Sequence, residues 1–443
     1  MRLAAATLAI ALLWTLVPLA PSAIAIAAGC DTPGTPTTTV YLPNITKTLG
    51  GPGGWVTPFI VQNVGTAAAT LEVSFYRFSD GSLVTCRKVT GLAPGTSFAD
   101  VPNNDTDLPA DSQFAVVVRS FGSQVVSVVN EHQGAGERAE ALSYVGLTTG
   151  ATKVALPYVA KAVGGWVTTF IIQNLGTATA TATVAFTSYD GTKTATLTRT
   201  IGPGRSQVVD ATVEAAVAAG LEHSVLVTST QPVAVVVNAH NDAPTALRPM
   251  GFSYNAVDAG RPGTYAPYAS RNTDGVARTS RIIVQNTGTA DATPVLTFRR
   301  IGQTGSAAVT APSPVKPGRS WSFDPRFQAD GTTACAAAGG PTCVAEGEHS
   351  VVVSGGTFAT LVIVSSPATA MGYTAGSPTT QRMYLANVTR TLGGATGWTT
   401  PLLIQSAGAT SATLRWYRFA DGGLAVTQHV PGLTSGATVR VDP

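Results

Sequence analysis

The residues best suited to chemistry in this sequence are its few histidines. The chain of 443 residues has five, and His223 and His240 flank two apolar segments separated by turn residues 229–232. If these segments pair as an antiparallel hairpin, residue 223 faces about residue 238, which brings both imidazoles to one end of a sheet. Glu222 or Asp242 would lie nearby. A metal ion needs three or four convergent ligands, so two histidines fall short, and ordinary polar strand ends are the simpler interpretation.

Sequence patterns of catalysis and cofactor binding are absent. The chain has no Gly-x-Ser-x-Gly motif or comparable Ser/His/Asp set, and its glycines fall in turns rather than in a phosphate-binding loop. Acidic residues are sparse and scattered over predicted loops, which gives no pattern for a paired-carboxylate glycosidase. We therefore predict a protein that is not an enzyme and needs no cofactor.

The four cysteines predict two disulfides. Cys335 and Cys343 lie eight residues apart and would close one loop, while Cys30 with Cys86 would tie the N-terminal tail to the first domain. An alternative stays open, because Ala27-Ala28-Gly29-Cys30 resembles a bacterial lipobox, and a lipid on Cys30 would leave Cys86 unpaired. A zinc site is not indicated, since no Cys-x-x-Cys pair or clustered histidines accompany the cysteines.

The N-terminus predicts export. Residues 1–28 combine Arg2, an apolar run and small-x-small cleavage sites, as a secretory signal peptide does, and residues 29–37 form a linker. A retained membrane anchor over Leu3–Leu19 is the alternative. We expect an extracellular or cell-envelope protein. The net charge of +3 comes without any basic cluster, which argues against a nucleic-acid partner.

Tryptophan marks a repeated segment. Trp55, Trp166 and Trp398 each follow a glycine, and the first two begin a run that ends in Gln-Asn-x-Gly-Thr. Arg278 occupies the tryptophan position of a further copy. The spacings are 111 (55 to 166), 112 (166 to 278) and 120 residues (278 to 398), the size of one small domain.

The pattern within each repeat predicts a set of short strands. Leu71–Phe78 alternates with period two, Asp80-Gly81 follows as a tight turn, and about seven such strands fit into one repeat. The sequence therefore predicts an all-β protein of tandem antiparallel immunoglobulin-like β-sandwiches, three complete and one partial. We place the repeats at residues 38–150, 151–260, 261–377 (divergent, with the Cys335/Cys343 insertion) and 378–443.

The fourth repeat is expected to be partial because Pro443 is the counterpart of about Pro102, so the last three strands have no counterpart. Half a sandwich exposes an apolar face and unpaired edges. An incomplete gene or a shortened chain would explain this. Completion by strands from a partner molecule and C-terminal disorder are the alternatives.

The tryptophan column, the Asp-Gly turns and the Pro-Gly turns together resemble the tandem immunoglobulin-like repeats of bacterial secreted and cell-surface proteins, the CARDB-like (cell-adhesion-related) domains. The resemblance covers nearly all of the chain after the signal peptide. It implies a stalk, adhesion or scaffold module and carries over no catalytic residues. The third repeat departs most from the pattern.

Two functions follow as hypotheses. The first is a non-enzymatic exported surface array acting as stalk, adhesin or scaffold, with cell-surface or extracellular-matrix components as partners. The second is a carbohydrate- or matrix-binding array that stacks polysaccharide on Trp55, Trp166 and Trp398 and gains avidity from repeated weak sites. Burial of these rings would favour the first hypothesis, and coplanar exposed rings would favour the second.

Overall fold

The computed structural model describes residues 25–28, 30–134, 140–242, 249–273, 277–377, 382–395 and 397–443. Within these ranges every regular element is a β-strand apart from one short 3-10 turn, Pro102–Asn104. The predicted all-β class is confirmed, with several antiparallel sheets. No helix in the described part of the chain is long and apolar enough to cross a membrane.

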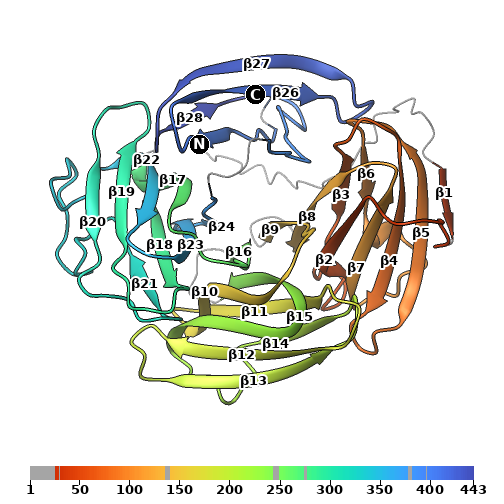
Figure 1. Ribbon diagram of the computed structural model, residues 1–443, viewed down its shortest axis with the longest axis horizontal. Coiled ribbons are helices and arrows are strands. Elements are labelled where there is room, and N and C mark those ends of the chain that lie inside the picture. The colour runs from red at the N-terminus through yellow and green to blue at the C-terminus, as the bar shows by residue number, and fades with distance from the viewer. Residues whose placement is uncertain are drawn as a thin grey trace, which may run out of the picture.

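Four β-units follow one another around a ring (Figure 1). Strands β1–β9 form the first unit, β10–β16 the second, β17–β24 the third and β25–β28 the fourth, and in the described residues no sheet mixes strands of different units. The fourth unit, in blue, lies between the third and the first. Its Gly422 approaches the first unit so closely that an added Cβ would lie 2.8 Å from the Pro94 carbonyl oxygen.

The first unit has two sheets that enclose one core. Their strand orders are β1-β5-β4-β7-β2 and β6-β3-β8-β9. Apolar side chains from both sheets form a single buried cluster, as the period-two alternation predicts. The strands are β1 (Ala25–Ala28), β2 (Thr38–Lys47), β3 (Phe59–Asn63), β4 (Ala69–Arg77), β5 (Leu83–Leu92), β6 (Ser97–Asp100), β7 (Ser112–Phe121), β8 (Val125–Gln133) and β9 (Glu140–Val145).

The predicted signal peptide lies mostly outside the described residues, which begin at residue 25. The last four residues of the predicted peptide form β1, which pairs antiparallel with β5 from Ala25 opposite Thr90 to Ala28 opposite Arg87.

The second unit is one nearly closed, barrel-like sheet of seven strands. It closes because the long strand β15 pairs with β12 and β10 and also with β11 and β16. The strands are β10 (Ala151–Val163), β11 (Trp166–Asn174), β12 (Ala180–Ser188), β13 (Thr194–Ile201), β14 (Ser206–Asp210), β15 (Leu221–Asn241) and β16 (Met250–Asn255).

The hairpin predicted around residues 229–232 is wrong. The two halves of β15 do not pair with each other: His223 lies opposite Val159 and Ser188, whereas His240 lies opposite Val167 and Gly251. Residues 229–232 form no turn but lie within the continuous strand β15, and each half of this strand satisfies its backbone hydrogen bonds with other strands. Alternation along the chain shows which face of a strand is buried, but it does not show which strands lie beside it.

The third unit is also one sheet, of eight strands, but within its described residues no single strand closes it as β15 closes the second. The fourth unit has two separate two-stranded sheets, β25-β28 and β26-β27. The third unit contains β17 (Thr264–Thr273), β18 (Arg278–Asn286), β19 (Val295–Arg300), β20 (Ala307–Thr310), β21 (Ser320–Phe323), β22 (Gly347–Ser354), β23 (Phe358–Ser366) and β24 (Thr369–Thr374). The fourth contains β25 (Leu402–Gln405), β26 (Thr410–Tyr417), β27 (Leu424–Leu433) and β28 (Thr438–Val441).

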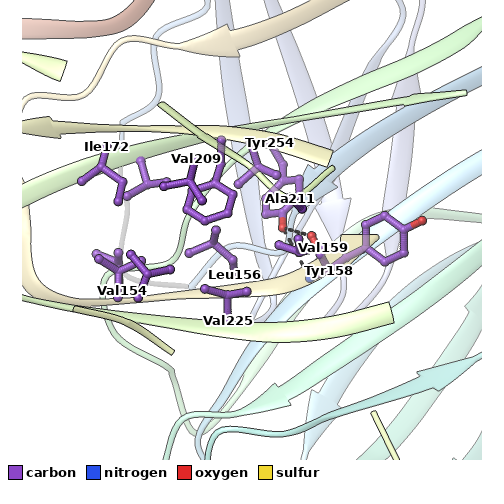
Figure 2. Packing of buried hydrophobic residues seen from close by; sticks show 14 of the residues in the cluster. Val154, Leu156, Tyr158, Val159, Ile172, Val209, Ala211, Val225 and Tyr254 are labelled. Atoms are coloured by element: carbon purple, nitrogen blue, oxygen red, sulfur yellow. Dashed lines mark hydrogen bonds between the residues drawn. The ribbon is translucent and has the colours of Figure 1, made fainter. Parts of the chain in front are cut away.

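The units share their cores with their neighbours. Figure 2 shows part of the second unit's cluster, in which Leu156 and Val225 are fully buried. Ile283 of the third unit belongs to this cluster, just as Ile171 of the second unit belongs to the cluster of the first. Fully burying such a side chain contributes about 1.5–3 kcal/mol. The units therefore stabilise one another through the same apolar packing that stabilises each of them.

Both predicted disulfides are present. Cys30 pairs with Cys86 at a Cα–Cα distance of 5.7 Å, and Cys335 pairs with Cys343 at 5.5 Å. This pairing occupies Cys30, so the structure does not have the arrangement of the lipidation alternative, in which Cys86 stays unpaired. Disulfides indicate an oxidising environment such as the extracellular space.

Candidate site at the junction of the first two units

The three recurrent tryptophans have different surroundings. Trp55 is half-buried, and its ring lies 5.0 Å from the imidazole of His240 in the second unit. Trp166 is also half-buried and packs 5.4 Å from the ring of Phe252. Trp398 is 73% exposed. The described residues therefore do not present three coplanar exposed rings.

Trp55 is held in place by backbone pairing ahead of β3. Its amide donates to the Leu49 carbonyl, and its own carbonyl accepts from the Leu49 amide. Gly54 permits this approach, because an added Cβ there would collide with the Leu49 carbonyl oxygen. Gly397, before Trp398, meets the same constraint at the Leu392 carbonyl oxygen, whereas Gly165, before Trp166, has a positive φ of 87°.

His240 forms a cluster with two carboxylates. One ligand atom each from Glu140, His240 and Asp242 lie within 4.8 Å of one another, and the His240 Nδ1 to Glu140 Oε1 distance is 3.8 Å. Glu140 comes from β9 of the first unit, and His240 comes from β15 of the second. Burial and the neighbouring Glu140 charge raise the pKa of Asp242, while His240 lowers it.

His223, the other histidine of the predicted pair, is not in this cluster. Its buried ring lies edge-on to Phe186 at 6.1 Å. Burial lowers the pKa of His223, which favours the neutral imidazole. The described residues therefore bring His240 together with Asp242, as predicted for that end of the strand, and with Glu140, which the sequence did not indicate.

A second buried carboxylate lies at the same junction. Glu131 Oε2 accepts hydrogen bonds from Asn44 Nδ2 (3.2 Å) in the first unit and from Asn238 Nδ2 (2.9 Å) in the second. Burial raises the pKa of Glu131 to about 8, and the two amides oppose that shift. The Tyr144 hydroxyl donates to the Asn44 carbonyl (2.6 Å) and completes the network.

The recurrent Gln-Asn pair has structural roles. Asn63 Nδ2 donates to the Ala67 and Leu92 carbonyls, which supports the turn role predicted for the asparagine, and Asn174 and Asn286 make the matching bonds. The neighbouring glutamines reach further. In the second, third and fourth units the glutamine bonds both the turn of its own unit and the backbone of the preceding unit: Gln173 to Val116, Gln285 to Val225 and Gln405 to Val351. Gln62, in the first unit, bonds only its own turn among the described residues.

Glu131 and Glu140 were not predicted as site residues, although a signal for Glu131 is present. Val125, Ser127 and Val129 share its strand parity, and all three are buried, so an inward-facing carboxylate follows from alternation alone. The same signal is present for Glu140, which shares strand parity with the buried Leu142 and Tyr144.

Comparison with known proteins gives little. No protein-family model matches the chain, and no curated protein does. Among solved structures, "Crystal Structure of Thermotoga maritima 1070" is similar, with 18% sequence identity, coverage of 24% of this chain and 93% of that chain, and a TM-score of 0.21. This match is distant and partial and carries no inference about function.

Proposed function

We propose that the chain is a non-enzymatic, exported surface protein in which immunoglobulin-like modules form a rigid scaffold for adhesion or display. The observation that carries the proposal is the use of the repeated residues. Recurrent glutamines and isoleucines make contacts between units: Gln173, Gln285 and Gln405 bond the backbone of the preceding unit, and Ile171 and Ile283 enter its core. Repeated residues in a repeated ligand site would instead face solvent.

Two further observations support this role. The disulfides fit an exported protein, and the predicted signal peptide agrees with them. The units pack side by side around a ring and share core residues, so the scaffold is a compact block (Figure 1). A compact block holds its loops at fixed positions relative to one another, which suits the display of several weak contacts at once.

The carbohydrate-binding alternative has less support. Trp55 and Trp166 each place one ring against a neighbouring aromatic side chain, and only Trp398 offers an open face. A single exposed ring gives none of the avidity that a repeated site would provide.

Surface shaving of intact cells of the native host tests the proposal. Protease added outside the cells should release peptides of this chain, and immunodetection should place it in the envelope or medium. Recovery from the cytosol alone would refute the proposal. In a parallel pull-down on insoluble polysaccharides, Trp55→Ala and Trp398→Ala should bind no less than the wild type does. Saturable, tryptophan-dependent binding would favour the carbohydrate-binding array instead.

A further inference from the structure

We propose that Glu140, His240 and Asp242 bind a divalent transition-metal ion such as Zn²⁺, and that this ion links the first unit to the second. The site combines one imidazole nitrogen with two carboxylate oxygens. Both ligand types are common in zinc sites with three protein ligands, where water completes the coordination. Imidazole favours transition metals over Mg²⁺ and Ca²⁺, which prefer oxygen ligands throughout.

The spacing of the ligand atoms suits such an ion. All three lie within 4.8 Å of one another, and the Nδ1–Oε1 pair is 3.8 Å apart. Ligand bonds of about 2.0–2.2 Å in tetrahedral geometry separate neighbouring ligand atoms by roughly 3.3–3.6 Å. A small inward movement is sufficient, and Asp242, the exposed member of the set, can supply most of it.

Within the described part of the chain, one oxygen of the buried Glu140 carboxylate accepts no hydrogen bond. The Glu140 side chain is fully buried; its Oε2 accepts from Gln133 Nε2, but Oε1 has no hydrogen-bond partner among the described residues. Nδ1 of His240 is likewise buried and without a hydrogen bond in the described part of the chain. Both atoms point toward the same space. A buried anionic oxygen without a partner is costly, and a cation between these two atoms removes that cost.

Gly251 and Trp55 border the site. Gly251 lies opposite His240 on β16, and an added Cβ there would lie 3.3 Å from Glu140 Oε1, so a larger residue would crowd the oxygen. The Trp55 ring covers the imidazole from the first unit. Glycine beside the carboxylate and an aromatic wall beside the imidazole together form a partly closed site.

The next junction provides an internal comparison. By strand register, the counterpart of Glu140 in the second unit is Met250, and the counterpart of His240 in the third unit is Ser365. Neither is a strong ligand for Zn²⁺. The proposal therefore predicts one ion per chain, at the first junction only.

Isothermal titration of the EDTA-treated full chain with Zn²⁺ tests the proposal. We expect one site per chain with a dissociation constant in the micromolar range, and no comparable heat with Mg²⁺ or Ca²⁺. Co²⁺ should give the visible absorption of a low-symmetry site. His240→Gln and Glu140→Gln should each weaken binding by at least about tenfold. His429→Gln, which removes an exposed histidine of the fourth unit, should bind as the wild type does.

Three results would overturn the proposal. One is the absence of saturable Zn²⁺ binding, which would make the cluster an ordinary pairing of His240 with carboxylates. Another is unchanged affinity in His240→Gln, and the third is a loss of affinity in His429→Gln. Because Glu140 is buried and its variant can fail to fold, Asp242→Asn serves as the second variant. It should fold, as judged by circular dichroism, and still bind Zn²⁺ more weakly.

Discussion

The first junction, between the first and second units, and the second junction, between the second and third units, use the same contacts. They differ in how their carboxylate groups are paired. Both bury an isoleucine of the following unit in the core of the preceding one, and both place a glutamine on its backbone. The first junction buries the carboxyl groups of Glu131 and Glu140 without a lysine or arginine partner among the described residues. The second pairs Glu222 with Arg281. The isoleucine and glutamine contacts therefore recur at both junctions, while the charged residues differ between them.

The largest effect should come from the shared isoleucines. Ile171→Ala and Ile283→Ala each open a cavity in a core that belongs to two units, and each should lower the free energy of unfolding by about 2–5 kcal/mol. Leu403 is their half-buried counterpart in the fourth unit and provides the matched control. Leu403→Ala should lower the free energy of unfolding clearly less. Midpoints of denaturant unfolding measure the differences. Equal losses at all three positions would show that the depth of burial at a junction does not set its contribution to stability.

The pH dependence of stability should separate the two junctions. The ordinary pKa of glutamate is 4.5, and burial raises the pKa of Glu131 to about 8. Between these values the unfolded chain has released the proton that the folded chain retains. Stability from this group is therefore full below about pH 4.5 and falls as the pH rises toward 8, by up to roughly 1.4 kcal/mol per pH unit.

Glu131→Gln should remove that slope. The amide cannot titrate, so the variant should gain stability relative to the wild type as the pH rises from 5 to about 8. Thermal unfolding across this pH range provides the measurement. Asp107→Asn, at an exposed position of the same unit, should follow the wild type. A variant with the wild-type slope would place the titrating group elsewhere. The second junction has Ala239 at the matching position and contributes no such slope.

Arg281 carries the charge pairing of the second junction. Its guanidinium makes two parallel hydrogen bonds to the Glu222 carboxylate, one of them 2.5 Å long between Nη1 and Oε1. Arg281→Ala leaves Glu222 without this partner and should cost about 2 kcal/mol. Lysine cannot reproduce the paired bonds, so Arg281→Lys should recover only part of the loss.

An exposed ion pair supplies the control for this loss. Arg326 and Asp324 lie close together on the surface of the third unit, and Arg326→Ala should change stability by no more than about 1 kcal/mol. Unfolding midpoints in low and high salt compare the stability losses of Arg281→Ala and Arg326→Ala. If Arg281→Ala costs as little as Arg326→Ala, the second junction does not depend on its ion pair.

The strand content of this fold follows from the sequence more readily than its junctions do. Period-two alternation and turn residues such as Asp80-Gly81 predict an all-β chain, and cysteine counting predicts both disulfides. The pairing of the two halves of β15 is not predictable in this way, because alternation shows which face is buried and not which strand lies beside it. His240 therefore has a partner, Glu140, that comes from another unit and is distant in the sequence.

The glutamine that recurs at one position of each unit also has contacts that the sequence does not predict. Its substitution has the smallest expected effect on stability. Gln285 Nε2 donates to the carbonyls of Val225 in the preceding unit (3.2 Å) and Gly318 in its own (3.1 Å). Gln62, at the same position in the first unit, reaches only its own turn at Gly95 (3.4 Å) among the described residues. Sequence alone makes the two identical, since both precede an asparagine that supports a turn.

Leucine in place of each glutamine separates the two environments. Gln285→Leu removes two hydrogen bonds and leaves two carbonyls without them, and should cost about 1–2 kcal/mol, whereas Gln62→Leu should cost at most about half as much. Hydrogen exchange at the Val225 and Gly318 segments should rise in the first variant, because opening there no longer breaks the shared bonds. Equal costs at both positions would mean that the glutamine stabilises the turn alone and that the isoleucine contacts hold the units together.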